Sequence, residues 1–188
     1  MTRPTLSLDN KDAGQLAPNL DDKGFGMSLF ADGRYQWRET YFVLFDRQHR
    51  PKGADVKKAL AELAPKVEIL DVQSDENGLL ESMTILAHAD AAGMDVTYVE
   101  GDEVREQVTE LKKDWKGQSF SSDEKTKVDR ALQATARLDI YHFEELGDGF
   151  LDEDDEDHLD PAALLTVLSK LARLSHGVSI DPQSGTVI

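Results

Sequence analysis

The feature that most constrains the fold is a run of five apolar residues, Tyr41-Phe42-Val43-Leu44-Phe45, with charged residues on either side. Successive side chains of a β-strand point to opposite faces of the sheet, so this strand presents apolar groups to both faces. A strand of that kind is stable where both of its faces are covered. The run therefore predicts a strand in the centre of a sheet.

Apolar residues at helical spacing predict the helices. Ser121 and Glu124 have the spacing of a capping box, which would begin a helix there. Pro65 is expected to end the first helix, and Gly177 to end the last one as a left-handed cap. The predicted helices span 54–64, 101–115, 121–136 and 162–174. The last of them is rich in leucine, and its wide apolar surface predicts that it is buried against a sheet.

Alternating or continuous apolar runs predict several further strands. Asp32-Gly33 is a hairpin dipeptide, and it predicts a turn between a strand near 25–30 and the strand that starts at Tyr35. The other predicted strands lie at 66–73, 79–88, 94–101, 138–146, 178–181 and 185–188.

These elements together predict an α+β fold with a mixed or antiparallel sheet and with helices mainly on one face. The order of the first six elements resembles a ferredoxin-like βαββαβ unit with additional strands, one of them at 94–101. We expect residues 25–188 to form a single domain. Residues 1–24 are polar and show no period, so we expect them to be disordered or loosely attached.

The net charge of the chain limits the kinds of binding partner that it can have. The 188 residues include 37 Asp and Glu against 21 Lys and Arg, which gives a formal net charge of −16 at pH 7. Such a charge repels nucleic-acid phosphates and anionic lipid headgroups, so we expect neither a nucleic-acid nor a membrane partner. A basic protein partner suits this charge.

The absence of cysteine excludes disulfides, zinc–thiolate sites and thiol nucleophiles. The first residues lack the apolar core of a secretory signal, and no run approaches the roughly 18 apolar residues of a membrane helix. These observations together predict a cytoplasmic protein.

An acidic segment is the most conspicuous candidate site, since eight of the thirteen residues in 148–160 are carboxylates. Asp152, Asp154 and Glu156 occupy alternating positions, as the first ligands of a calcium loop do. The sixth position is Asp157 where an EF-hand has glycine, and Pro161 falls at the tenth, so the EF-hand pattern fails. The segment predicts either a weak divalent-cation site or a hydrated acidic loop.

His142 and Glu144 form a second candidate site, because residues two apart in a strand share a face. They could hold a metal or act as an acid–base pair, with His88 from the end of another strand. The alternative is that Tyr141 and Phe143 point to the core while His142 and Glu144 point to solvent.

A compact basic patch is the third candidate. Arg47, His49, Arg50 and Lys52 follow the central strand and precede the helix near residue 54, where an anion could bind. The alternative is a positive turn that balances its acidic neighbours.

Two segments resemble parts of a family of uncharacterised bacterial α+β proteins. The ending "LSKLARLSHGVSIDPQSGTVI" is similar to the close of those proteins, where a Leu-rich helix stops at Gly and a short strand and an Asp-Pro-Gln turn follow. The stretch "WRETYFVLF" is similar to their first core strand. The resemblance implies a bacterial, intracellular domain, and it transfers no site residue.

No Gly-x-Ser-x-Gly, dinucleotide-binding or Walker pattern is present. We therefore expect a non-catalytic binding or regulatory module without a cofactor. The alternatives are a divalent-cation-dependent enzyme that uses the 148–160 segment with His142 and Glu144, an inhibitor that mimics nucleic acid, and adaptation of the surface to salt. A homodimer is compatible with this sequence, because the exposed edges of a small sheet can pair.

Overall fold

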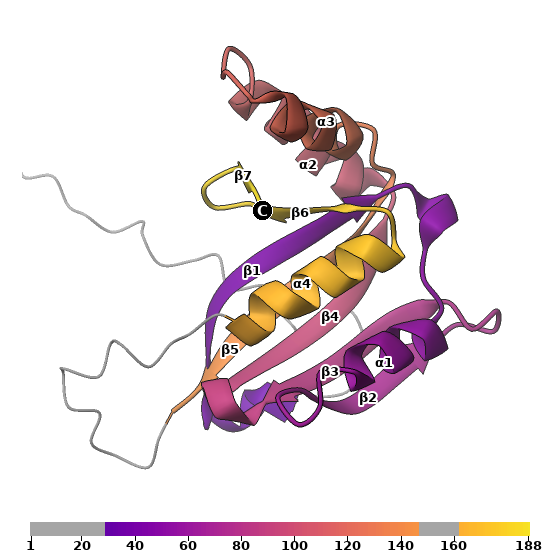
Figure 1. Cartoon of the computed structure of the whole chain (residues 1–188), viewed down its shortest axis with the longest axis vertical. Coiled ribbons are helices and arrows are strands. Elements are labelled where there is room, and N and C mark those ends of the chain that lie inside the picture. The colour runs from indigo at the N-terminus through magenta and orange to yellow at the C-terminus, as the bar shows by residue number, and fades with distance from the viewer. Residues whose placement is uncertain (1–28, 147–161) are drawn as a thin grey trace, which may run out of the picture.

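The computed structural model of the chain describes residues 29–146 and 162–188, which contain one antiparallel sheet of seven strands in the order β2-β3-β4-β5-β1-β6-β7 (Figure 1). The strands are β1 (Tyr35–Phe45), β2 (Glu68–Ser74), β3 (Leu80–Ala87), β4 (Ala92–Glu100), β5 (Ala136–Glu145), β6 (Val178–Asp181) and β7 (Thr186–Val187). The α-helices are α1 (Gly53–Ala61), α2 (Asp102–Asp114), α3 (Ser122–Ala131) and α4 (Ala162–Leu174). The predicted α+β class is confirmed, and the sheet is antiparallel.

Strand β1 occupies the interior position that its apolar run predicts. It pairs with β5 along one side and with β6 along the other. Val43 and Leu44 point to opposite faces of the sheet, and both are completely buried. Each face of β1 is therefore covered by its own layer.

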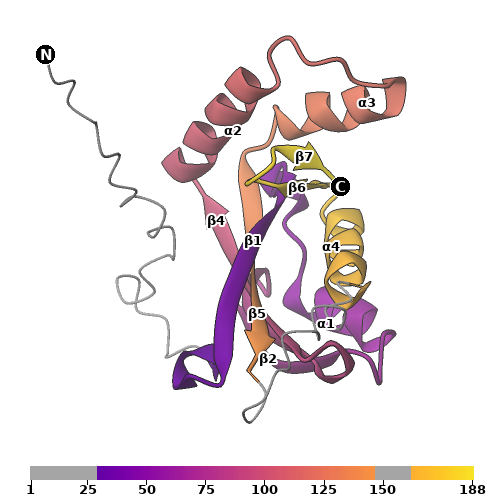
Figure 2. The same ribbon diagram turned by 90° about the vertical axis from the view of Figure 1, so that its left-hand side faces the viewer.

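One layer consists of α1 and α4, which lie along the same side of the sheet in Figure 2. They cover the face to which Val43 and Phe45 point, and with it they form the larger hydrophobic core. Helix α4 contributes Ala163, Leu164, Val167, Leu168 and Leu171. The predicted burial of the Leu-rich helix is confirmed.

The other layer consists of α2 and α3, which lie at one end of the sheet (Figures 1 and 2), and their apolar residues pack on the opposite face. There Phe42 and Leu44 belong to a second core with Leu111 of α2 and Val128 of α3. The helices therefore divide between the two faces, and do not lie mainly on one face as the sequence predicts. The apolar groups on both faces of β1 explain this, because each set requires its own cover.

The ferredoxin-like arrangement is not confirmed. Helix α1 connects β1 to β2, and three strands, β5, β4 and β3, lie between them in the sheet. The predicted strand at 94–101 is β4, which pairs with β3 and β5 in the interior. The predicted domain limits at residues 24 and 25 lie outside the described residues and stay predictions.

Residues Leu29–Asp32 form a 3₁₀ helix, where the sequence predicts the end of a strand and a hairpin turn. The ring of Phe30 stacks on Phe143 of β5, with 4.7 Å between ring centroids. It also covers Gly93 of β4, where an added Cβ would lie 2.2 Å from a ring carbon. Phe30 therefore packs on the α2/α3 side of the sheet through a contact with a distant glycine.

The end of α4 differs from the prediction in one residue. The left-handed residue is His176, with φ 50°, and not Gly177. Gly177 donates its N–H to the carbonyl of Ala172 at 2.8 Å, as in a Schellman motif. A Cβ at Gly177 would lie 2.8 Å from the carbonyl oxygen of Leu44, so close packing on β1 explains the glycine.

Candidate functional site

His142 and Glu144 point to the face of the sheet that α4 covers, and not to open solvent. Their neighbours on β5 with the same orientation, Leu138 and Ile140, belong to the larger core. The side chain of His142 is 13% exposed and that of Glu144 is 11% exposed. Both residues therefore require partners within the fold.

These partners come from the bulged start of β1. Arg38 forms an ion pair with Glu144, and Glu39 Oε1 lies 3.6 Å from His142 Nδ1, which has no hydrogen-bond partner among the described residues. Burial lowers the pKa of His142, against the opposing effect of Glu39. The environment therefore favours the neutral imidazole.

The described residues do not assemble a metal centre around this pair. In the ranges 29–146 and 162–188, no group of three or more His, Cys, Asp or Glu side chains could hold a metal ion. His88 forms a 2.8 Å pair with Glu68 at an exposed site. Asp152, Asp154 and Glu156 lie outside the described residues, so the predicted divalent-cation site stays a prediction.

The predicted basic patch separates into one inward and three outward residues. Arg50 donates to the carbonyl of Leu80 at 2.9 Å, lies 3.4 Å from Asp75 and stacks over the ring of Tyr98 at 3.8 Å. Its charge therefore joins the loop before α1 to strands β3 and β4. Arg47, His49 and Lys52 are exposed, and an anion site at this patch stays a prediction.

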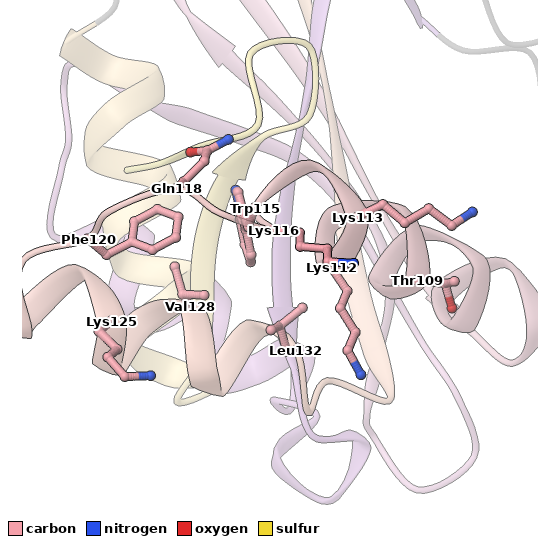
Figure 3. Close-up of a pocket in the computed structure, with 10 residues that line it drawn as sticks. All are labelled: Thr109, Lys112, Lys113, Trp115, Lys116, Gln118, Phe120, Lys125, Val128 and Leu132. Atoms are coloured by element: carbon pink, nitrogen blue, oxygen red, sulfur yellow. The ribbon is translucent and has the colours of Figure 1, made fainter.

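Among the described residues, a groove with a volume of about 680 Å³ lies between α2 and α3 (Figure 3). We call it the lysine groove. Its lining residues are Thr109, Lys112, Lys113, Trp115, Lys116, Gln118, Phe120, Lys125, Val128 and Leu132.

Aromatic and aliphatic side chains form the floor of the lysine groove. Trp115 follows the last turn of α2, is 5% exposed, and donates its indole N–H to the carbonyl of Gly185 at 2.7 Å. Phe120 meets the indole edge-to-face, with 6.1 Å between ring centroids. Val128 and Leu132 complete the floor from α3 and its C-cap (Figure 3). The indole of Trp115 therefore has a contact at its ring and a hydrogen bond at its nitrogen.

Four lysines also line the groove. Lys112 and Lys113 lie in the last turn of α2, Lys116 follows it, and Lys125 lies on α3. Lys125 forms a 3.1 Å pair with Asp129, whereas no ion pair holds the other three within the described ranges. No Asp, Glu, His or Ser lines the groove among these residues. The groove is therefore cationic in a chain of net charge −16.

Sequence reasoning missed the lysine groove. The lysines of α2 are accounted for locally, since cations near a helix C-terminus interact favourably with the helix dipole. Trp115 continues the apolar stripe of α2, and such a stripe indicates packing in the core. The signal was the spacing of Lys112, Lys113 and Lys116 around Trp115, but the second wall comes from α3.

A second hollow of about 610 Å³ lies between α3, α4 and β6. Its lining includes Lys127, Arg130 and Arg173, together with His176. Lys127 already donates to the terminal carbonyl oxygen of Ile188 at 3.1 Å. No aromatic ring except His176 lines it among the described residues, so it lacks the stacking floor of the lysine groove.

The buried ion pair of Arg137 and Asp139 connects parts of the fold. Arg137 and Asp139 of β5 form a buried pair, with 3.1 Å between Nη2 and Oδ2, and the guanidinium lies 4.4 Å from the centroid of the Phe42 ring. Burial raises the pKa of Asp139, against the effect of Arg137. Arg137 also donates to the backbone carbonyl of Glu103 at 3.5 Å, which holds the start of α2 on the sheet.

Comparison with known proteins finds no match for the chain among protein-family models, curated proteins or solved structures. No helix in the described ranges is long and apolar enough to cross a bilayer. The assignment of a function therefore depends on the chemistry of the sites alone.

Proposed function

We propose that the protein is a non-catalytic binding module and that the lysine groove is its binding site. The observation that carries the proposal is the composition of the groove, in which four lysines and two aromatic side chains line one hollow. A ligand for such a site combines an apolar side chain with negative charge. Ammonium groups attract carboxylates or phosphates, and the apolar floor contributes through burial.

Binding is favoured over catalysis because of what lines the groove. General acid–base chemistry requires a titratable group near neutral pH, and nucleophilic chemistry requires an activated Ser, Cys, Thr or Lys. Among the described lining residues, Thr109 is the only hydroxyl group, and no His or carboxylate lies beside it. The lysines are suited to attract and hold an anion.

The acidic surface adds a second expectation. The net charge of −16 suits a basic protein partner, and such an interaction would weaken as salt is added. The lysine groove would take the opposite charge. We therefore propose two surfaces of opposite sign in one cytoplasmic binding module.

Titration with anilinonaphthalene sulfonate tests the groove, because this probe has one anionic group on an aromatic body. In a Trp37→Phe background, Trp115 is the only tryptophan and reports binding at the groove floor. The double variant Lys112→Glu with Lys116→Glu should bind the probe with an affinity about tenfold lower. The control is Lys57→Glu with Lys58→Glu, which makes the same charge change on α1.

Equal affinity of the groove variant and the control for the probe would refute the proposal.

The divalent-cation-dependent enzyme remains the alternative, and calorimetry with Ca²⁺, Mg²⁺, Mn²⁺ and Zn²⁺ tests it. An affinity weaker than about millimolar for all four ions would exclude it. A further alternative is an inhibitor that mimics nucleic acid. Such an inhibitor must bind a nucleic-acid-binding protein, and a pull-down at several salt concentrations would detect this binding.

A further inference from the structure

We infer that the lysine groove binds the segment Phe150–Asp157 of a second copy of this chain, so that the protein forms a homodimer by exchange of acidic segments. This inference rests on the proposed function of the groove as a binding site. It adds the identity of the occupant and an oligomeric state.

The chemistry of the segment matches that of the groove. Phe150 and Leu151 are apolar, and the six residues 152–157 that follow are all Asp or Glu. The groove offers Trp115 and Phe120 for an apolar anchor and four lysines for the carboxylates. An apolar pair followed directly by acidic residues can therefore meet the floor and the lysines together.

The other stretch outside the described residues does not match. Residues 1–28 contain four Asp and no Glu, against Arg3, Lys11 and Lys23. Their charges nearly cancel, and no apolar pair is followed by an acidic run. Charge complementarity therefore selects the 148–160 segment as the occupant.

Phe150, the apolar anchor of the segment, cannot reach the groove of its own chain. Strand β5 begins near the groove, after α3 and Leu132, and ends at Glu145 at the opposite end of the sheet (Figure 2). Its ten residues, at about 3.3 Å each, separate the two ends by about 30 Å. Phe150 is only four residues beyond Leu146, which allows a reach of about 14 Å. A groove that holds Phe150 must therefore belong to another molecule.

Reciprocal exchange closes the assembly. If each copy provides its segment and receives that of its partner, a two-fold axis relates the two contacts. Both grooves and both segments are then occupied, so the assembly stops at a dimer. The attraction is between exposed opposite charges and should weaken as salt is added.

Sedimentation velocity of the full chain at low and high salt tests the inference. The wild-type chain should dimerise at low salt and dissociate at high salt. Lys112→Glu with Lys116→Glu should weaken the dimer by about tenfold or more, as should Asp152→Lys with Asp155→Lys. The combination of both pairs should restore the dimer, because the charges are exchanged. The control on α1, Lys57→Glu with Lys58→Glu, should dimerise as the wild type does.

A synthetic peptide with the sequence of residues 147–161 gives a second readout that does not depend on assembly. In the Trp37→Phe background it should change the fluorescence of Trp115 and compete with the dimer. A wild-type chain that stays monomeric, or a dimer that the groove variant leaves intact, overturns the inference. If the chain is monomeric but the groove still binds the sulfonate probe, the occupant is wrong and the proposed function stands. If the groove variant binds the probe as the control does, the proposed function itself fails.

Discussion

Helices α2 and α4 have the same length of 13 residues but bury very different surfaces. Helix α4 buries five side chains on its face of the sheet, whereas α2 buries two, Val104 and Leu111. The buried faces of α1 and α4 belong to the larger core of the fold. The layer of α2 and α3 is thinner and leaves part of its apolar seam open as the lysine groove. The difference shows that similar helices can pack to different depths on the two faces of one sheet, and the shallower packing leaves the groove that we propose as the binding site.

The buried pair of Arg137 and Asp139 offers the largest expected effect on this comparison, because it lies under the thinner layer. Arg137→Met leaves the Asp139 carboxylate without its cation and should lower the free energy of unfolding by about 3–5 kcal/mol. The double variant with Asp139→Leu should regain most of this loss. Urea denaturation measures both, and a double variant no more stable than Arg137→Met would show that the pair is not the cause.

Two matched truncations compare the layers directly. Leu168→Ala in α4 removes a completely buried side chain from the larger core and should cost about 3 kcal/mol. Leu111→Ala in α2 should cost about 2 kcal/mol, because the thinner layer can shift to fill the cavity. Chemical denaturation measures the loss in free energy of unfolding for both variants. A loss for Leu111→Ala that equals or exceeds the loss for Leu168→Ala contradicts the distinction between the layers.

A smaller effect concerns pH and the buried His142 beneath the α4 layer. Its folded-state pKa lies below the ordinary value of 6.5, so the unfolded chain binds a proton that the folded chain does not. Stability from this group is complete above pH 6.5 and is lost as pH falls through the folded pKa. The charged groups around it are Glu39, Arg38 and Asp90.

His142→Gln should remove this loss, whereas His88→Gln at an exposed site should retain it. Urea unfolding at a series of pH values between 5 and 8 measures the slopes. A variant at position 142 that keeps the slope of the wild type would assign the pH dependence to other groups.

The smallest effect is expected at the end of α4, where His176 adopts φ 50°. Glycine has no steric penalty in that conformation, so His176→Gly should stabilise the chain by about 0.5 kcal/mol. Gly177→Ala provides the contrast, because its Cβ would meet the carbonyl of Leu44 and should destabilise the chain. Thermal unfolding of the two variants should shift in opposite directions.

Local signals in the sequence predicted elements well where one residue pattern is sufficient. The capping box of Ser121 and Glu124 forms as predicted, with both of its hydrogen bonds, although the helix ends at Ala131 and not near 136. The position of β1 and the burial of α4 were also predicted, because their apolar patterns leave few alternatives. The 3₁₀ helix at Leu29–Asp32 was not, since Phe30 gains its burial from a distant glycine on β4.

The lysine groove could not be predicted for the same physical reason. Its floor and lysines come from two helices and their connection, and α2 and α3 are placed by separate contacts with the sheet. The seam between them depends on how far each helix is buried. That distance is a property of the packing, and no periodicity of either helix encodes it.

The amino-acid sequence alone determined the α+β class, a strand apolar on both faces, an excess of negative charge and the absence of thiol chemistry. These follow from composition and from patterns within single elements, where each residue's burial is set by its neighbours along the chain. The tertiary structure decided the order of the strands, the division of the helices between two faces, and the meeting of four lysines with Trp115 and Phe120. Such contacts join residues from different elements, and many pairings of the same elements would satisfy the same local patterns.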